Sequence, residues 1–338
     1  MKLSHEILEL ETAHPFGIAR GTQSVYRAVW VRLTDRDGVE GWGEANPSSF
    51  YGETADTVVA ALGRLAPLLA EADAFDLEAV EGRMRNSLKG NAAARVAVSA
   101  ALHDLVGKRL GVPLWKLWGL DPAAAPVSSF TIGIDEPEVI RQKIREAAPY
   151  PILKIKVGTA DDRKILRTVR EATDKKLRVD ANCGWTAPQA IASLPMLKEF
   201  GVELIEQPLP PTDLEGLARV RRASDIPIIA DESCRTAADI PPLVGAVDGI
   251  NIKLAKCGSL REALRMIAVA RAHHLMVMVG CMIETSIGIT AAAHFTPLLD
   301  VVDLDGAALL KRDPFTGASI AGGRVSLPTA PGLGVARR

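Results

Sequence analysis

The segment from residue 152 to residue 181 reads ILKIKVGTADDRKILRTVREATDKKLRVDA. It begins with an apolar, β-branched run, continues through a polar turn and an amphipathic stretch, and ends in a second apolar run. Ile165, Leu166 and Val169 share one face of the amphipathic stretch, as in a helix that packs on a sheet. The segment therefore predicts a strand, a helix and a second, parallel strand.

The same unit recurs from about Val127 onward, at intervals of roughly 20 to 28 residues. The strand candidates are VSSFTIG (127–133), ILKIKV (152–157), KLRVDA (176–181), VELIEQ (202–207), IPIIAD (226–231), GINIKL (249–254), MVMVGC (276–281) and DVVDLD (300–305). Eight such units favour a closed α/β barrel of the TIM type, with its chemistry at the C-terminal ends of the strands. An open doubly wound sheet fits the same alternation and remains an alternative.

The N-terminal part follows a different pattern. Two apolar runs, VYRAVWVRL (25–33) and VEGWGEA (39–45), flank Asp37-Gly38 and predict a hairpin. Alanine-rich helices are expected at 54–71, 76–87 and 91–110.

These patterns predict two domains. An α+β capping domain is expected over 1–123, completed by the Gly- and Pro-rich tail 310–338, and a catalytic barrel domain over 124–309. The tail contains one more strand-like stretch, GGRVSLP (322–328), and is expected to pack back on the N-terminal part.

Composition excludes several classes of function. The net charge of −1 supplies no attraction for nucleic acid or an anionic membrane, so small molecules are the expected partners. The chain has no apolar run of the roughly 18 residues that a membrane helix needs, and no secretory signal, which predicts a cytoplasmic protein. Its four cysteines have no CxxC spacing and are expected to be reduced.

Acidic residues end three successive predicted strands. Asp180, Glu206 and Asp231 would therefore converge above the barrel. Three converging carboxylates cannot all stay ionised without a cation, and an all-oxygen site suits Mg²⁺. A role for each acid as a helix cap or a lysine partner explains any one of them, but poorly explains all three.

Lysines occupy inward positions on other strands. Lys154 and Lys156 point the same way because side chains alternate along a strand, and Lys253 is expected across the barrel from Lys156. We expect the repulsion between Lys154 and Lys156, with partial burial, to lower the pKa of one of these two lysines toward neutrality, as a lysine base requires. Lys256, just past its strand, is an alternative to Lys253 as the catalytic lysine, but it is expected to be a solvated surface lysine.

A metal with two opposed lysines suits proton removal next to a carboxylate. The α-proton is weakly acidic, and its anion needs the charge stabilisation that Mg²⁺ provides. One lysine on each face permits removal of the proton from one side and its return on the other, which inverts the stereocentre.

The chain resembles the enolase superfamily in the subgroup with a KxK motif, here Lys154-Ile155-Lys156. The motifs that carry the resemblance are ALHDLVGKRLGVPLWKLWG (101–119), VDANCGW (179–185), EQPLP (206–210), ADESC (230–234) and NIKLAKCGSL (251–260). The resemblance implies a capped (β/α)7β barrel, with Asp180, Glu206 and Asp231 as Mg²⁺ ligands and Lys156 and Lys253 as the acid/base pair. Enzymes of this superfamily use a lysine or histidine base together with Mg²⁺. Members of this family commonly form homo-oligomers.

The motif Asp303-Leu304-Asp305 resembles the DxD motif with which dipeptide epimerases bind the substrate ammonium group. Segments around Arg20 and Tyr51 also resemble these enzymes, although a local ion pair is an equally simple role for Arg20. The remaining expected substrate contacts are Lys154, Thr131, Cys281 and Met282, with Asn182, Glu232 and Glu284 behind them. A helix N-cap is the alternative role for Glu284.

The resemblance thus implies epimerisation of a dipeptide such as L-Ala-L/D-Glu. Arg20, Lys311 or Arg312 would favour an acidic side chain, while hydrophobic and cationic ones stay open. N-acylamino acid racemase, o-succinylbenzoate synthase and muconate cycloisomerase are alternative activities that use the same metal and lysines. A metal-binding barrel without catalysis is the alternative from another class.

Overall fold

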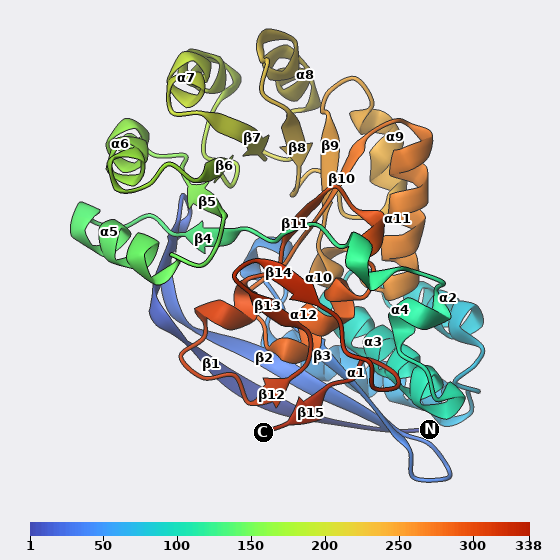
Figure 1. The fold of residues 1–338 in the computed structure, drawn as a ribbon. Helices are drawn as coiled ribbons and strands as arrows, with labels where there is room; N and C mark the ends of the chain where they lie inside the picture. Colours follow the sequence, from blue (N-terminus) through green and yellow to red (C-terminus); the bar gives the residue numbers. More distant parts are fainter.

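An antiparallel three-stranded sheet forms the N-terminal part of the computed structural model, which describes residues 1–338 (Figure 1). Its strands, in the order β1-β2-β3, are β1 (Lys2–Ile18), β2 (Gly21–Thr34) and β3 (Glu40–Ala45). The expected hairpin is β2–β3, and Asp35 shapes its turn by accepting the N–H groups of Asp37 and Val39. The long strand β1 extends this hairpin into a sheet.

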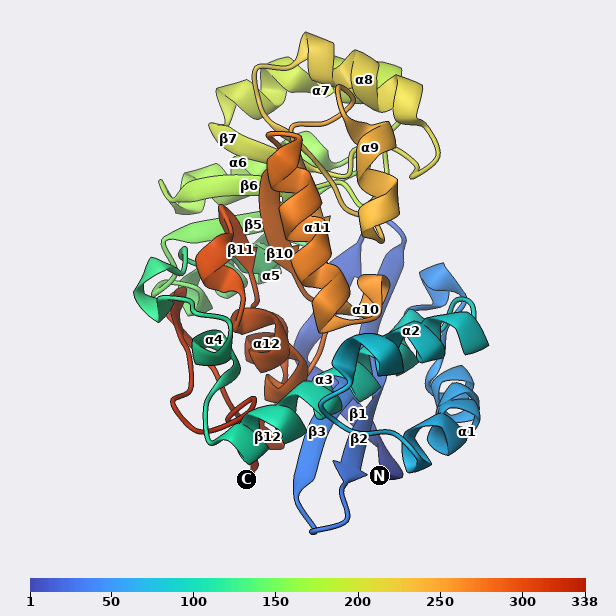
Figure 2. The same cartoon turned by 90° about the vertical axis from the view of Figure 1, so that its right-hand side faces the viewer.

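Three helices cover one face of this sheet, as Figure 2 shows. They are α1 (Ala55–Ala70), α2 (Leu77–Ser87) and α3 (Ala92–Leu110), close to the expected ranges. The backbone of α3 comes very near β3 because Gly41 and Gly43 have no side chain. A Cβ at either glycine would collide with a carbonyl oxygen of α3, that of Ala101 or Ala97.

Eight parallel strands form the second sheet, in the sequential order β4 to β11 (Figure 1). They are β4 (Phe130–Ile132), β5 (Ile152–Lys156), β6 (Lys176–Asp180), β7 (Val202–Glu206), β8 (Ile228–Ala230), β9 (Gly249–Ile252), β10 (Met276–Gly280) and β11 (Val301–Asp303). A parallel bridge between Ser128 and Val302 joins the first and last strands. The barrel prediction is therefore confirmed, and the open-sheet alternative is wrong.

Helices cross over between successive barrel strands. They are α5 (Pro137–Glu146), α6 (Asp162–Ala172), α7 (Ala187–Glu199), α8 (Leu214–Ala223), α9 (Ile240–Leu243), α10 (Leu254–Cys257), α11 (Leu260–Ala272) and α12 (Ser286–Ala293). The only helix after β11 is the short 3₁₀ helix η5 (Gly306–Leu309). This pattern confirms the predicted (β/α)7β form.

The barrel interior changes from apolar to charged toward the C-terminal ends of its strands. Leu204, Ile229, Met278 and Val301 form a buried apolar cluster. The next residue of the same parity on these strands is Glu206, Asp231, Gly280 and Asp303, respectively. An apolar floor therefore lies beneath the charged residues.

The C-terminal tail contacts both sheets. Phe315 packs edge-on against Trp30, with ring centroids 5.1 Å apart, and Leu310 joins a buried cluster with Leu10 and Ala28. Gly323, in the strand-like stretch GGRVSLP, accepts the N–H of Ser128 at 2.8 Å and so lies beside the barrel. The short tail strands are β12 (Phe315–Thr316), β13 (Ser319–Ala321), β14 (Arg324–Ser326) and β15 (Ala336–Arg337).

No helix in the structure has both the length and the apolar character that a membrane crossing requires.

His294, just after α12, links this helix to the tail. Its Nδ1 accepts the N–H of Trp115 at 3.3 Å, and its Nε2 donates to the carbonyl oxygen of Leu333 at 3.1 Å. Burial lowers the pKa of His294 from 6.5 to about 4. Because the pKa is lower in the folded state, the stability linked to this group is complete above pH 6.5 and is lost as the pH falls toward 4.

We expect His294→Gln to flatten this part of the pH dependence, since glutamine takes up no proton. The melting temperature of the wild type should fall more steeply than that of the variant between pH 6.5 and pH 4. Scanning calorimetry at several pH values measures both curves. Parallel curves would show that His294 does not contribute.

Candidate active site

Asp180, Glu206 and Asp231 meet at the C-terminal end of the barrel. Asp180 ends β6, Glu206 ends β7 and Asp231 directly follows β8. One oxygen from each lies within 4.8 Å of the others, and all three side chains are buried. The convergence expected from the strand spacing is therefore present in the fold.

Lysines surround these carboxylates. Lys154 Nζ lies 2.7 Å from Glu206 Oε2 and 3.1 Å from Asp180 Oδ2, while Lys156 Nζ lies 2.6 Å from Asp180. Burial opposes the charge on Asp180, but Lys156 and Lys154 outweigh it and hold its pKa below the usual value. Glu206 differs, because burial and the charge of Asp180 raise its pKa to about 7.

The three carboxylates fit a divalent cation. All the donor atoms are oxygens, the ligands that Mg²⁺ prefers. Glu206 Oε2 is buried and accepts no hydrogen bond of suitable geometry, although Lys154 lies close by. A cation at this point would satisfy that oxygen and offset the repulsion that raises the pKa of Glu206. Asp180, Glu206 and Asp231 are thus the residues that would hold it.

Lys156 and Lys253 lie on opposite sides of the barrel. Lys156 ends β5 and Lys253 follows β9, so three strands separate them in the closed sheet. Both line one cavity of about 680 Å³. Lys253 Nζ contacts Asp231 at 2.7 Å on its side of the barrel, as Lys156 contacts Asp180 on the other.

Repulsion between Lys154 and Lys156 is expected to lower the pKa of one of them, but the pKa of Lys154 is not lowered. Burial opposes the charge on Lys154 and on Lys253, but the adjacent carboxylates outweigh it and hold both pKa values well above the usual one. The sequence shows Lys154 and Lys156 as neighbours on one strand. In the fold, carboxylates from other strands contact both of them.

The expectation of a solvated Lys256 is also wrong. This side chain has no exposed surface, and its Nζ lies 2.5 Å from Oδ1 of Asp231. It also donates to the carbonyl oxygens of Cys234 and Asn251, both at 3.0 Å. The short helix α10 turns Lys256 back under Asp231, a reversal that strand parity does not reveal. Lys256 therefore fixes the position of Asp231.

Asp303 and Asp305 line the same cavity from β11 and the turn that follows it. Asp303 accepts hydrogen bonds from Ser129 Oγ at 2.6 Å and Lys154 Nζ at 2.8 Å. Asp305 accepts the N–H of Thr131 at 2.6 Å. Burial and the charge of Asp303 raise the pKa of Asp305 to about 7. A substrate cation near Asp305 would relieve that repulsion.

Arg20 reaches the barrel from the turn after β1. Its Nη1 donates to the carbonyl oxygen of Asn182 at 2.7 Å and to Glu232 at 3.0 Å, and its guanidinium stacks on Phe50. The local ion pair is therefore present, although Arg20 and Asn182 also line the cavity. Tyr51 does not line it and lies against Arg235 instead.

The end of β10 supplies Cys281 and Met282 to the cavity wall, as expected. Glu284 lies behind them, where it accepts the N–H of Met282 at 2.7 Å. Burial and the charge of Glu44 raise the pKa of Glu284 to about 8. The N-cap alternative for Glu284 is wrong, because Thr285 caps α12.

Several cavity residues were not predicted from the sequence. Phe16, Ile18, Asn46 and Phe50 reach the barrel from the N-terminal part. Asn46 directly follows β3, and a polar residue at a strand end was the available signal. By contrast, Lys311 pairs with Glu11 outside the cavity, and neither Lys311 nor Arg312 lines it. The four cysteines are free, as expected.

A capped (β/α)7β barrel with carboxylates and lysines at its strand ends is the architecture of enolase-type enzymes. Two family models match: "Mandelate racemase / muconate lactonizing enzyme, N-terminal domain" over residues 4–119, and "Enolase C-terminal domain-like" over residues 138–337. The chain therefore belongs to the mandelate racemase/muconate lactonizing enzyme family of the enolase superfamily.

Similar proteins include the L-Ala-D/L-Glu epimerase of Bacteroides thetaiotaomicron, 42% identical over 99% of this chain and 88% of the relative. A dipeptide epimerase from Enterococcus faecalis, complexed with Mg and L-Leu-L-Tyr, superposes with a TM-score of 0.94 at 35% identity, covering 99% of both chains. An N-succinyl Arg/Lys racemase from Bacillus cereus has a TM-score of 0.91 at 26% identity, covering 100% of this chain and 96% of its own.

We expect Lys256→Met to weaken Mg²⁺ binding about 10- to 100-fold, because Asp231 loses the group that fixes its orientation. Calorimetric titration of the metal-free protein with Mg²⁺ measures this affinity, and a thermal melt checks that the variant is folded. Lys164→Met is the matched control, since the Lys164 side chain is 59% exposed. Unchanged Mg²⁺ affinity in folded Lys256→Met would contradict the role assigned to Lys256.

Proposed function

We propose that the protein is a dipeptide epimerase that moves one proton at the α-carbon of a dipeptide such as L-Ala-L/D-Glu. The observation that carries the proposal is the shared cavity of Lys156, Lys253, Asp303 and Asp305. The lysines provide acid and base, and the aspartates provide a site for an ammonium group. The names of the relatives from B. thetaiotaomicron and E. faecalis support the same activity.

Proton transfer falls to Lys156 and Lys253. A planar substrate anion between them faces one lysine on each side, because the lysines extend from opposite walls of the barrel. The lysine that is neutral removes the α-proton, and the ammonium of the other lysine returns a proton to the opposite face. Mg²⁺, when bound by Asp180, Glu206 and Asp231, supplies positive charge to the substrate carboxylate and makes the α-proton more acidic.

Substrate binding falls to the remaining cavity residues. In the proposal Asp305, assisted by Asp303, holds the substrate ammonium, and Lys154 faces the substrate carboxylate. Thr131, Cys281 and Met282 contact the peptide from the barrel. Arg20 would favour an acidic side chain, since both of its hydrogen bonds in the protein use Nη1. Asn182 holds Arg20 at the cavity wall, and Glu232, Glu284 and the ring of Tyr51 support these groups from behind.

We also propose the wider organisation expected from the sequence. Residues 1–123 and the tail 310–338 would act as the capping domain, and 124–309 as the catalytic domain. The contacts of Leu310 and Phe315 with the N-terminal sheet support this division. A cytoplasmic homo-oligomer with small-molecule partners completes the proposal.

Racemisation of an N-acylated amino acid is the second candidate. Asp303 already accepts hydrogen bonds from Lys154 and Ser129, which leaves Asp305 as the more open carboxylate. An N-acylated substrate has no ammonium group and would not need either aspartate. The similarity to the N-succinyl Arg/Lys racemase of B. cereus supports this alternative.

Deuterium exchange tests the two-lysine mechanism. We expect L,L-dipeptides incubated with the Mg²⁺-loaded protein in D₂O to gain one deuteron, and epimerisation to cease in Lys156→Ala and in Lys253→Ala. Each variant should still exchange the epimer whose α-proton faces its remaining lysine. Mass spectrometry with chiral separation measures both, and Lys164→Ala serves as the exposed-lysine control. Full epimerisation by either active-site variant would contradict the mechanism.

Asp305→Asn separates the two candidate substrates. We expect dipeptide turnover to fall by about 10²-fold or more, because a charged hydrogen bond to the substrate ammonium is worth roughly 1.5–3 kcal/mol and positioning adds to it. Racemisation of N-succinyl amino acids should change little. Steady-state kinetics on both substrates measures the ratio. Equal losses on both, or turnover of N-succinyl substrates alone by the wild type, would favour the racemase.

A further inference from the structure

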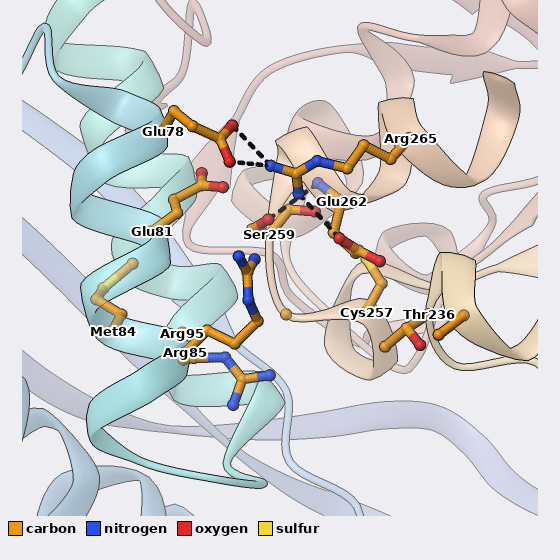
Figure 3. Close-up of a pocket in the computed structure, with 12 residues that line it drawn as sticks. Glu78, Glu81, Met84, Arg85, Arg95, Thr236, Cys257, Ser259, Glu262 and Arg265 are labelled. Carbon is orange, nitrogen blue, oxygen red and sulfur yellow. Dashed lines mark hydrogen bonds and ion pairs between the residues drawn. The ribbon is translucent and has the colours of Figure 1, made fainter. Parts of the chain in front are cut away.

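A second cavity lies between the N-terminal helices and the barrel (Figure 3). Helices α2 and α3 form one wall, and the segment around Thr236 and the residues joining α10 to α11 form the other. Its volume of about 330 Å³ lies within the range of small-molecule sites, roughly 300–1,000 Å³. None of its lining residues also lines the active-site cavity.

Part of its charge is already balanced. Arg265 contacts Glu262 at 2.9 Å and Glu78 at 2.6 Å, as the dashed lines in Figure 3 mark. Arg261 adds a second cation to Glu78 at 2.6 Å. The two positive and two negative charges of these four side chains balance, so this network does not favour a charged ligand.

Two other arginines in the wall form no ion pair. Arg85 forms no ion pair, and Arg95 donates only to the backbone carbonyl oxygens of Leu88 and Gly90. Burial lowers the pKa of Arg95, and the charge of Glu53, which does not contact it, offsets this only in part. Two guanidinium groups that no carboxylate contacts favour an anionic group in the cavity.

Glu81, in the same wall, needs a hydrogen-bond donor rather than an acceptor. Its side chain is only 2% exposed and lines the cavity, and its Oε1 accepts from Ser99 Oγ at 2.6 Å. Its other oxygen, Oε2, has no hydrogen-bond partner. His103 lies 3.9 Å from Glu81, but burial lowers the pKa of this histidine, so it does not neutralise the carboxylate. A buried carboxylate oxygen without a donor favours a cationic or N–H group nearby.

We propose that this cavity binds a small zwitterion, an α-amino acid, with its carboxylate toward Arg85 and Arg95 and its ammonium toward Glu81. A simple anion would leave Glu81 without a donor, and a simple cation would leave the two arginines without an acceptor. The site is independent of the proposed epimerase activity, because it contains none of the active-site lysines or aspartates. Its ligand would bridge the N-terminal helices and the barrel.

Calorimetric titration of the Mg²⁺-loaded protein with L-alanine and with L-glutamate tests the proposal. We expect saturable binding that weakens about tenfold or more in Arg95→Gln and in Glu81→Gln, because each loses one charged hydrogen bond. Arg85→Gln, at an exposed position, covers the case in which a buried variant fails to fold. Arg83→Gln is the matched control on the same helix, since Arg83 does not line the cavity, and should bind as the wild type does.

Acetate and methylamine, each carrying one half of the zwitterion, complete the test. Both should bind far more weakly than L-alanine. The proposal is overturned if neither amino acid binds, if acetate binds as tightly as L-alanine, or if Glu81→Gln and Arg95→Gln bind as the wild type does. Binding that is lost in Asp305→Asn but kept in Arg95→Gln would assign the amino acid to the active site and also overturn the proposal.

Discussion

The structure depends on the charge balance of one buried cluster. Asp180, Glu206 and Asp231 are enclosed at the top of an apolar barrel, where three carboxylates without nearby cations would repel one another. Lys154, Lys156, Lys253 and Lys256 offset that repulsion through contacts of 2.5 to 3.1 Å. Removing one partner of a buried ion pair typically costs about 3–5 kcal/mol. Each charged group at this site is therefore constrained by all the others.

Closure of the barrel makes this cluster possible. Parallel strands carry their C-terminal residues to the same edge, and the bridge between Ser128 and Val302 brings the first strands next to the last one. Asp303 can then accept a hydrogen bond from Lys154, although 149 residues separate them in the chain. The N-terminal part completes the wall of the cavity, with Arg20 anchored on the carbonyl oxygen of Asn182.

The errors made from the sequence share one physical cause. Lys256 follows its strand by a few residues, and nothing local distinguishes it from an exposed lysine; only helix α10 turns it inward to Asp231. The pKa of Lys154 depends likewise on carboxylates from other strands. The sequence pattern around a residue indicates the strand or helix that contains it. The charge state of that residue depends on neighbours that are distant in the sequence.

The sequence by itself determined the barrel and the three carboxylates, because strand alternation and charged strand ends are local signals that repeat along the chain. Only the tertiary structure decided which lysine contacts which carboxylate, that Thr285 rather than Glu284 caps α12, and that Phe16 and Asn46 reach the active site. It alone also placed Glu81 and Arg95 in the wall of a second cavity. These features arise where separate elements pack together, and no periodicity within one element encodes such a contact.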